Sequence, residues 1–285
     1  MPTPLVRALT AILLTSLFVG CQALQDSLGL EAPRARATGV SFQSLDLESL
    51  GLAFEVEVEN PYAVDLPLLR VGYDLASGAV PFLEGSAPLS GVVPAGGRRT
   101  LELPVRVQFA GLLEVLSGVS PGSVVPYEAG LDFFVDAPAV GEMKLPVRRT
   151  GELPIPTVPR VSLSSMKWDE VGLSGVRGAV ELQLENGNSF PIDLEELSYS
   201  LSVSGRQIAS AGIEETLALE AENASTLRIP LSLSALDLGL GLIDLLKGSG
   251  GQKTPYSLQG SLIVDTPFGA FDSPFQTDGS VPLSN

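Results

Sequence analysis

One segment of the chain has the spacing of a hydrolase nucleophile. Gly118-Val-Ser-Pro-Gly122 matches the Gly-x-Ser-x-Gly elbow, which requires a strand before the serine and a helix after it. The sequence predicts the opposite order, with a helix over 109–116 and a strand after Gly122. The serine also needs a histidine base, and the chain contains no histidine. We therefore interpret residues 118–122 as a loop that ends a helix.

A second segment pairs a serine with a lysine. Ser164 and Lys167 have the Ser-x-x-Lys spacing of penicillin-binding enzymes, whose serine opens a helix. Here the surrounding residues have the pattern of a strand, and the corresponding segment 43–46 of an internal repeat lacks the lysine. The spacing therefore predicts no catalytic pair.

The composition argues against most other kinds of functional site. With no histidine and a single cysteine, zinc, copper and haem sites would lack their usual ligands. Acidic pairs are common, but the sequence has no Asp-x-Asp-x-Asp-Gly loop of the kind that binds calcium. A glycosidase with two carboxylates remains open, although no pair stands out and Trp168 is the only tryptophan. The sequence thus predicts no catalytic residue, no cofactor and no metal site.

The single cysteine, Cys21, follows a segment with the features of a secretory signal peptide. Arg7 is the only charge within residues 1–20, and the apolar run 8–20 is too short to cross a bilayer core of about 30 Å. The segment Leu17-Phe-Val-Gly-Cys21 resembles the lipobox of bacterial lipoproteins. That resemblance implies a thioether-linked diacylglycerol and an N-linked acyl chain such as palmitate on Cys21, once residues 1–20 have been removed.

The same resemblance implies a location and a partner. Gln22 stands where an aspartate tends to retain such lipoproteins at the inner membrane, so the expected location is the outer membrane, facing either the periplasm or the outside. The membrane, contacted through lipidated Cys21, is the expected partner. A lipid or an envelope protein is a further candidate, and the oligomeric state is left open.

Charge excludes one class of partner and argues against a second membrane contact. The chain carries 33 acidic and 17 basic residues, for a net charge of -16, and both halves share the acidic excess. A phosphate backbone would be repelled, so no nucleic acid partner is expected. Because anionic headgroups recruit basic patches, the lipid on Cys21 is expected to anchor the protein alone.

The most extensive signal is an internal duplication. Landmarks in residues 40–156 recur in residues 161–285 at offsets of 126 or 129 residues, namely Asn60 with Asn186, Pro104 with Pro230, Pro126 with Pro255 and Pro138 with Pro267. A repeated unit of this length is a whole domain. We predict a signal peptide at 1–20, a tether at 21–36, a first domain at 37–152, a stiff proline-rich linker at 153–160 and a second domain at 161–285.

Alternation of apolar and polar residues dominates both copies. In residues 52–59 the apolar side chains fall on one face and three glutamates fall on the other, which is typical of a half-buried strand. Pro104 and Pro230 lie in strands of similar pattern. Because proline cannot donate to a ladder, we expect these two strands at sheet edges or at bulges.

One segment in each copy breaks this alternation. Residues 109–116 and 235–247 have apolar side chains at helical spacing, and glycines follow both segments, as is typical of helix ends. Each copy therefore contains several short strands, one helix and two more strands. The predicted fold is mainly β, with two tandem antiparallel β-sandwich domains, each with one helix.

The turns after two of the strands have a recognisable form. Asn60-Pro61, and above all Glu185-Asn-Gly-Asn-Ser-Phe-Pro-Ile192 with the aromatic strand and glycine hairpin that follow, resemble the WHy domain. This is the water-stress and hypersensitive-response domain of the late-embryogenesis-abundant group 2 proteins. Gly187 replaces the usual proline in the second copy, and Tyr62 replaces the second asparagine in the first. The resemblance implies a fibronectin-like or immunoglobulin-like sandwich, no enzymatic activity, and an association with desiccation and stress tolerance.

The asparagines of these turns have a structural role by their chemistry. Asparagine tolerates left-handed backbone and bonds its own turn, and proline fixes the φ angle of a turn. We therefore predict that Asn60, Pro61, Asn186 and Asn188 shape turns, with contact to a ligand as the alternative.

Together these features predict a non-enzymatic, membrane-anchored envelope lipoprotein with a protective or scaffolding role under water stress. One alternative is a binding module for a lipid or another apolar ligand, held between the sheets. The other is a scaffold for adhesion or protein assembly, because tandem immunoglobulin-like domains suit protein contacts.

Overall fold

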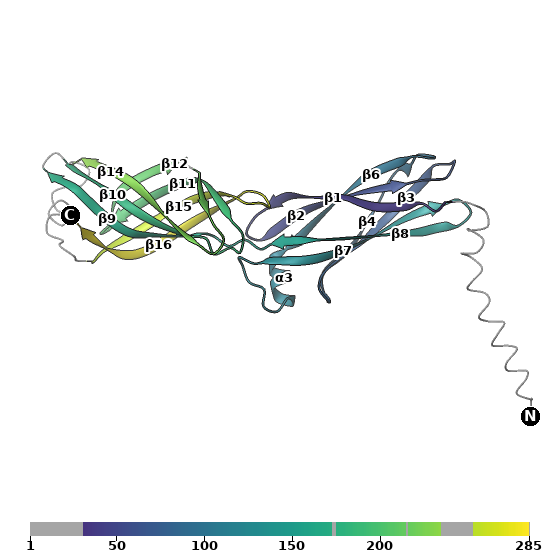
Figure 1. Cartoon of the computed structure of the whole chain (residues 1–285), viewed down its shortest axis with the longest axis horizontal. Coiled ribbons are helices and arrows are strands. Elements are labelled where there is room, and N and C mark those ends of the chain that lie inside the picture. The colour runs from purple at the N-terminus through teal and green to yellow at the C-terminus, as the bar shows by residue number, and fades with distance from the viewer. Residues whose placement is uncertain (1–30, 173–174, 215, 235–252, 285) are drawn as a thin grey trace, which may run out of the picture.

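The computed structural model describes residues 31–172, 175–214, 216–234 and 253–284. These residues form two β-sandwiches placed end to end along one long axis (Figure 1). The predicted fold class is therefore confirmed. The predicted signal peptide, Cys21 and the helix predicted over 235–247 lie outside the described residues.

The first repeat consists of two antiparallel sheets. One has the order β1-β2-β6 and the other the order β4-β3-β7-β8, with the short β5 beside β3. The strands are β1 (Arg34–Leu45), β2 (Ser49–Glu59), β3 (Leu66–Ser77), β4 (Val80–Pro88), β5 (Val92–Val93), β6 (Arg98–Gln108), β7 (Val124–Ala137) and β8 (Gly141–Pro154).

The second repeat has the same arrangement. Sheet β9-β10-β14 corresponds to β1-β2-β6, and β12-β11-β15-β16 corresponds to β4-β3-β7-β8, with β13 beside β11. In addition, the end of β16 pairs in parallel with β9, which joins the two sheets. The strands are β9 (Arg160–Gly172), β10 (Gly175–Glu185), β11 (Ile192–Val203), β12 (Arg206–Ile213), β13 (Leu217–Leu219), β14 (Ala224–Ser234), β15 (Lys253–Asp265) and β16 (Phe271–Ser284).

Strand β2 shows how the alternating pattern becomes a half-buried strand. It lies between β1 and β6, so its backbone is paired on both sides. Phe54, Val56 and Val58 are fully buried, whereas Glu55 between them is exposed. Because successive side chains point to opposite faces, one face of the strand supplies the core and the other meets water.

The two prolines predicted at sheet edges lie there. Pro104 is on β6 opposite Ala53, and Pro230 is on β14 opposite Ala179. Both strands are terminal in the described sheets, and both prolines are exposed. On an edge strand the missing N–H can point away from the sheet, so no ladder bond is lost.

The described residues contain one short helix, α3 (Phe109–Val115), at the place predicted from the spacing. Phe109 and Leu112 turn into the core, and the backbone N–H of Leu116 donates to the carbonyl oxygen of Leu112 at 3.0 Å. Gly118 then takes a φ of 81°, in the left-handed region. In the part of the chain that the structure describes, helices of the length and apolar character needed to cross a membrane are absent.

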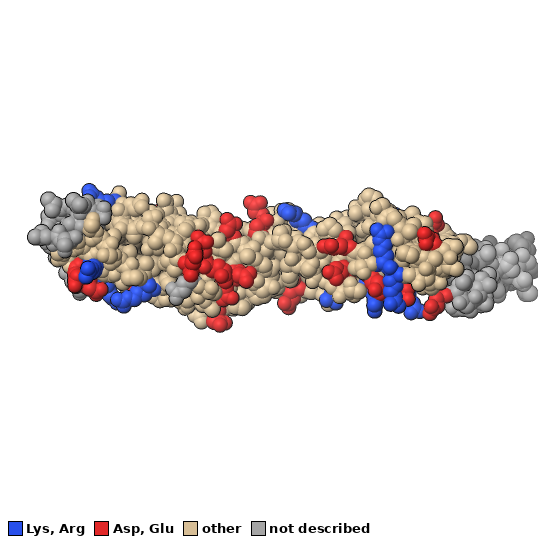
Figure 2. All heavy atoms as spheres, turned by 90° about the horizontal axis from the view of Figure 1, so that it is seen from above, with Lys and Arg blue, Asp and Glu red and all other residues tan. Residues whose placement is uncertain are grey.

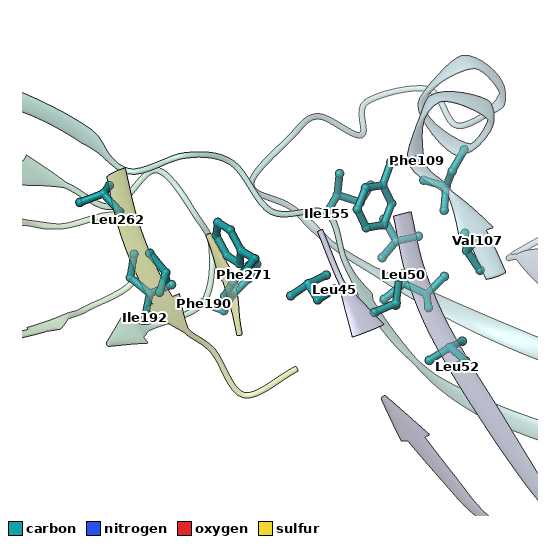
Figure 3. Packing of buried hydrophobic residues seen from close by; sticks show 14 of the residues in the cluster. Leu45, Leu50, Leu52, Val107, Phe109, Ile155, Phe190, Ile192, Leu262 and Phe271 are labelled. Atoms are coloured by element: carbon teal, nitrogen blue, oxygen red, sulfur yellow. The ribbon is translucent and has the colours of Figure 1, made fainter. Parts of the chain in front are cut away.

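Apolar side chains from both sheets fill each sandwich. Phe54 of β2 meets Tyr127 of β7 edge to face, with ring centroids 6.3 Å apart. The buried apolar residues of the two repeats belong to one continuous cluster. Figure 3 shows where they approach each other, with Leu45 and Ile155 on the side of the first repeat and Phe190 and Phe271 on the side of the second.

Candidate functional site

Asn60 follows β2 and ties its turn to a distant loop. The residue is only 1% exposed. Its Nδ2 donates to the carbonyl oxygens of Val64, Val93 and Pro94 at 2.8, 3.0 and 3.0 Å. Its Oδ1 accepts from the backbone N–H of Tyr62 at 3.0 Å. One buried amide therefore joins the turn between β2 and β3 to the segment at β5.

Asn186 repeats this arrangement in the second repeat. It is 2% exposed, and its Nδ2 donates to the carbonyl oxygens of Phe190, Leu219 and Glu220 at 2.9, 3.2 and 3.1 Å. Its Oδ1 accepts from the backbone N–H of Asn188 at 2.9 Å. Each partner lies 126 residues after its counterpart in the first repeat, so the duplication preserved the whole network.

The backbone at these two positions is ordinary. Positive φ angles occur at other residues, and neither Asn60 nor Asn186 has one. The tolerance of asparagine for left-handed backbone therefore does not explain its presence at these two positions. Their main role is to bond carbonyl oxygens 33 and 34 residues downstream. Every residue has a backbone carbonyl, so the sequence does not reveal which ones accept these bonds. Pro61 and its counterpart Gly187 simply occupy the next position of each turn.

Asn188 ties the second repeat to the connection that precedes it. It is fully buried. Its Oδ1 accepts from the backbone N–H of Thr157 at 2.8 Å, and its Nδ2 donates to the carbonyl oxygen of Thr157 at 3.1 Å. The same Nδ2 lies 2.9 Å from Oδ1 of Asn186. Thr157 belongs to the short connection between β8 and β9, so this connection is held by the turn of the second repeat.

The Gly-x-Ser-x-Gly segment contributes to the same junction. As expected, it follows a helix and precedes a strand. The backbone N–H of Gly122 donates to the carbonyl oxygen of Ile155 at 2.6 Å, and its carbonyl oxygen accepts from the N–H of Ser189 at 2.7 Å. Gly122 thus bonds both the connection and the second repeat, and its segment has a structural use in place of a catalytic one.

Aromatic rings complete the junction. Phe42 of the first repeat meets Phe268 of the second edge to face, with centroids 5.4 Å apart, and Phe268 meets Phe190 in the same way at 5.3 Å. Such pairs add to the stabilisation given by buried area. Hydrogen bonds from both repeats therefore reach residues 155 and 157 of the segment predicted as a stiff linker.

Replacing Gly122 with alanine is expected to loosen the junction. Gly122 has a φ of 94°, and an added Cβ would lie 2.5 Å from the carbonyl oxygen of Gly187. The backbone strain costs about 1–3 kcal/mol, and relief of the clash requires the repeats to move apart. Small-angle X-ray scattering should show a broader distribution of long distances, and proteases should cut faster between 154 and 160.

Gly118→Ala is the matched control for this variant. Gly118 also has a positive φ, 81°, but nothing lies within 4 Å of an added Cβ. It should therefore show the backbone cost alone, with scattering unchanged from the original protein. Equal scattering curves for the two variants would mean that Gly122 does not hold the repeats together.

A hollow of about 390 Å³ opens beside the junction. Its walls include Phe42, Tyr127 and Arg149 of the first repeat and Phe268 of the second. Burial raises the pKa of the Tyr127 hydroxyl, and the Arg149 charge acts in the opposite direction. The hollow combines aromatic surface with the Arg149 cation and the Glu152 carboxylate, and both repeats line it.

Ser164 and Lys167 are both engaged with the neighbouring strand β10. The Ser164 hydroxyl donates to the carbonyl oxygen of Glu181 at 2.8 Å. Lys167 Nζ lies 3.3 Å from Oε1 of Glu181, whose other oxygen accepts from Ser165 at 2.7 Å. The bonds from Ser165 and Lys167 lower the pKa of the Glu181 carboxyl. These contacts are those of a solvated strand face.

Carboxylates do not converge into a metal site in the part of the chain that the structure describes. Groups of three or more potential ligand residues are absent there. Glu195 and Glu214, which belong to the acidic pairs noted in the sequence, are both exposed.

The chain is similar to plant proteins of one family. The family model described as late embryogenesis abundant protein matches residues 55–151 and again residues 181–279. The desiccation protectant protein Lea14 homologue of Glycine max is 28% identical over 126 residues, which cover 44% of this chain and 83% of that protein. Late embryogenesis abundant protein Lea14-A of Gossypium hirsutum is 26% identical over 129 residues, which cover 45% of this chain and 85% of that protein.

A solved structure has the same kind of similarity. The solution structure of AT1g01470 from Arabidopsis thaliana is 26% identical and covers 45% of this chain and 85% of that one, with a TM-score of 0.38. Each of these relatives therefore aligns with less than half of the chain.

Proposed function

Because both of its repeats match the family model, the chain belongs to the late embryogenesis abundant protein family, and we propose that it protects components of the cell envelope under water stress without catalysing a reaction. The match in both repeats carries this proposal. The similarity to relatives named for desiccation protection suggests a stress-protective role. Neither serine motif argues for catalysis. Gly122 of the first motif, and Ser164 and Lys167 of the second, form structural contacts.

The surface supplies a physical means of protection. The chain has a net charge of -16, and acidic side chains are spread along the middle of the rod (Figure 2). Charged carboxylates hold water strongly and keep copies of the protein apart in solution. A rigid, hydrated rod placed between envelope components would keep them separated as water is lost.

We place this role at the outer membrane through lipidated Cys21. The support is in the sequence: a signal-peptide pattern, the lipobox resemblance, a single cysteine where cleavage is expected, and Gln22 after it. Two or more acyl chains anchor a protein stably, whereas one anchors it only marginally. The domains would then face either the periplasm or the outside.

Loss of the protein is expected to reduce survival of drying. A strain without the gene should survive drying and osmotic shock less well than its parent, and a copy of the intact gene should restore survival. Growth in ordinary medium serves as the control and should not change. Equal survival of the two strains after drying would remove the protective role.

The hollow at the junction favours a second candidate function, the binding of an apolar ligand. Its aromatic walls suit a small apolar molecule, with Arg149 and Glu152 available to its polar groups. Mass spectrometry of the folded, unlipidated protein should then detect such a molecule, and Phe268→Ala should reduce its retention. An empty protein that does not exchange a fluorescent fatty acid would leave only the protective role.

A further inference from the structure

Asn186 is the only asparagine of the chain that is followed by a glycine. In an unfolded chain such a pair is chemically labile. The backbone nitrogen of Gly187 attacks Cγ of Asn186 and closes a cyclic imide, while Nδ2 leaves as ammonia. Water then opens the imide at either of its carbonyl groups, which leaves an aspartate or an isoaspartate in place of the asparagine. Glycine favours this attack because it has no side chain and its backbone is the most flexible.

The folded second repeat opposes each of these steps at Asn186. The residue is 2% exposed, and its Nδ2 donates to three backbone carbonyl oxygens at distances between 2.9 and 3.2 Å. Its Oδ1 accepts from the backbone N–H and from Nδ2 of Asn188, both at 2.9 Å. Rotation of the side chain, or loss of Nδ2, would leave the buried carbonyl oxygens without this donor. Gly187 itself is exposed, so the protection comes from the hydrogen-bonded amide and not from burial of the attacking nitrogen.

The first repeat supplies an internal comparison. Asn60 has the equivalent hydrogen bonds, but the next residue is Pro61. The nitrogen of proline carries no hydrogen and cannot make the attack that closes the imide. The same network is therefore chemically durable in the first repeat, whereas in the second repeat it depends on the fold for its protection.

The product of the reaction does not fit the folded turn. A carboxylate only accepts hydrogen bonds, so at position 186 it would face the three carbonyl oxygens without a hydrogen to give them. A buried charge without a partner is strongly destabilising. An isoaspartate would in addition place an extra methylene group in the backbone of the turn. Either product would therefore remove the bonds that join this turn to the segment at β13.

We propose that Asn186 is a deamidation site that opens only when the second repeat unfolds, and that its deamidation prevents this repeat from refolding. Brief unfolding leaves the chain unchanged, whereas prolonged unfolding becomes permanent, because chemical modification of the unfolded state competes with refolding. The first repeat, with Pro61 after its asparagine, is exempt. The inference is independent of the anchor and of the protective role proposed above.

The test follows this modification in the folded and in the unfolded protein. The unlipidated chain is incubated at mildly alkaline pH in increasing concentrations of urea, and the conversion of Asn186 is measured by mass spectrometry of its peptide. Because modification tracks the population of the open form, conversion should be at least about a hundredfold slower in the folded chain than in the unfolded chain. The rate should rise with urea in step with the fluorescence of Trp168, which lies in the same repeat. Equal rates in folded and unfolded protein would overturn the proposal.

Two other asparagines serve as controls in the same samples. Asn60 should stay unmodified even in urea, because Pro61 follows it. Asn223 is exposed in the folded chain, so unfolding should change its rate little. A rise at Asn223 as large as that at Asn186 would mean that urea, and not loss of the buried network, controls the reaction, and this would also overturn the proposal.

Exchange of the residue after each asparagine tests the chemistry directly. Gly187→Pro should keep Asn186 intact in urea, and Pro61→Gly should make Asn60 react there as fast as Asn186 does in the original chain. Both measurements are made on unfolded protein, so they hold even if a variant fails to fold. Continued conversion of Asn186 in the Gly187→Pro chain would show that the nitrogen of Gly187 is not the attacking group.

Refolding of the original chain tests the consequence. After long incubation in urea, modified and unmodified chains are separated by ion exchange, since deamidation adds a negative charge, and the urea is then removed. Unmodified chains should regain the folded Trp168 signal in full, whereas modified chains should not regain it. Modified chains that refold with the original signal and the original stability would overturn the proposed block to refolding.

Discussion

Replacing Asn186 with alanine is expected to lower the free energy of unfolding of the second repeat by about 3–4 kcal/mol. Three carbonyl oxygens would lose their donor, and the N–H of Asn188 would lose its acceptor. A buried polar group without a partner costs about 1–3 kcal/mol. Because this turn is buried, water cannot replace the lost hydrogen bonds as freely as it would in an exposed turn. Trp168 is the only tryptophan and lies buried on β9, so its fluorescence in urea reports this repeat.

Two further variants test whether the destabilisation comes from loss of the buried amide. Asn60→Ala removes the equivalent network from the first repeat, so circular dichroism should detect a loss of similar size while the Trp168 signal shifts less. Asn223→Ala removes only an exposed bond to the neighbouring N–H of Ala224, and its effect should stay within about 0.5 kcal/mol. If Asn186→Ala were no more destabilising than Asn223→Ala, the Asn186 amide would not contribute to stability, and packing alone would stabilise the turn.

Replacing Cys21 with serine is expected to release the protein from membranes altogether. A hydroxyl cannot form the thioether through which the lipobox resemblance would attach diacylglycerol. Each buried methylene of an acyl chain contributes about 0.8 kcal/mol, so removal of the chains removes nearly all of the membrane affinity. The protein should move to the soluble fraction and should no longer incorporate labelled palmitate.

Gln22→Asp is the matched variant for the anchor. It leaves Cys21 in place and, by the same resemblance, should retain the protein at the inner membrane instead of the outer one. Density-gradient separation of the two membranes measures this directly. Continued membrane association of the Cys21→Ser protein would contradict the lipoprotein proposal.

The patterns that depend on neighbouring residues could be predicted well. The alternation in residues 52–59, the edge prolines Pro104 and Pro230, and the helix at 109–116 all lie as expected. The reason is that the direction of a side chain in a strand or helix follows from local geometry. The duplication was equally visible, because it repeats local patterns in order.

The contacts of the candidate site could be predicted only in part. The bond of Asn60 within its own turn follows from asparagine chemistry, but its bonds at β5 do not, since any residue offers a carbonyl oxygen. Asn188 was assigned to a turn, and only the structure shows that it also holds Thr157. Gly122 was noted for a catalytic spacing and proved to be a junction residue.

The sequence by itself determined the strands, their edges, the two copies, the net charge and the candidate anchor, because each is a property of residue order or composition. Only the tertiary structure decided that Phe42 meets Phe268 and that the two repeats form one rod. Chain topology decides which distant residues become neighbours, and the direction in which a charge points depends on that topology. A count of charges therefore argues against a nucleic acid partner, but it could not show that Arg36 and Arg98 share one carboxylate, that of Glu57.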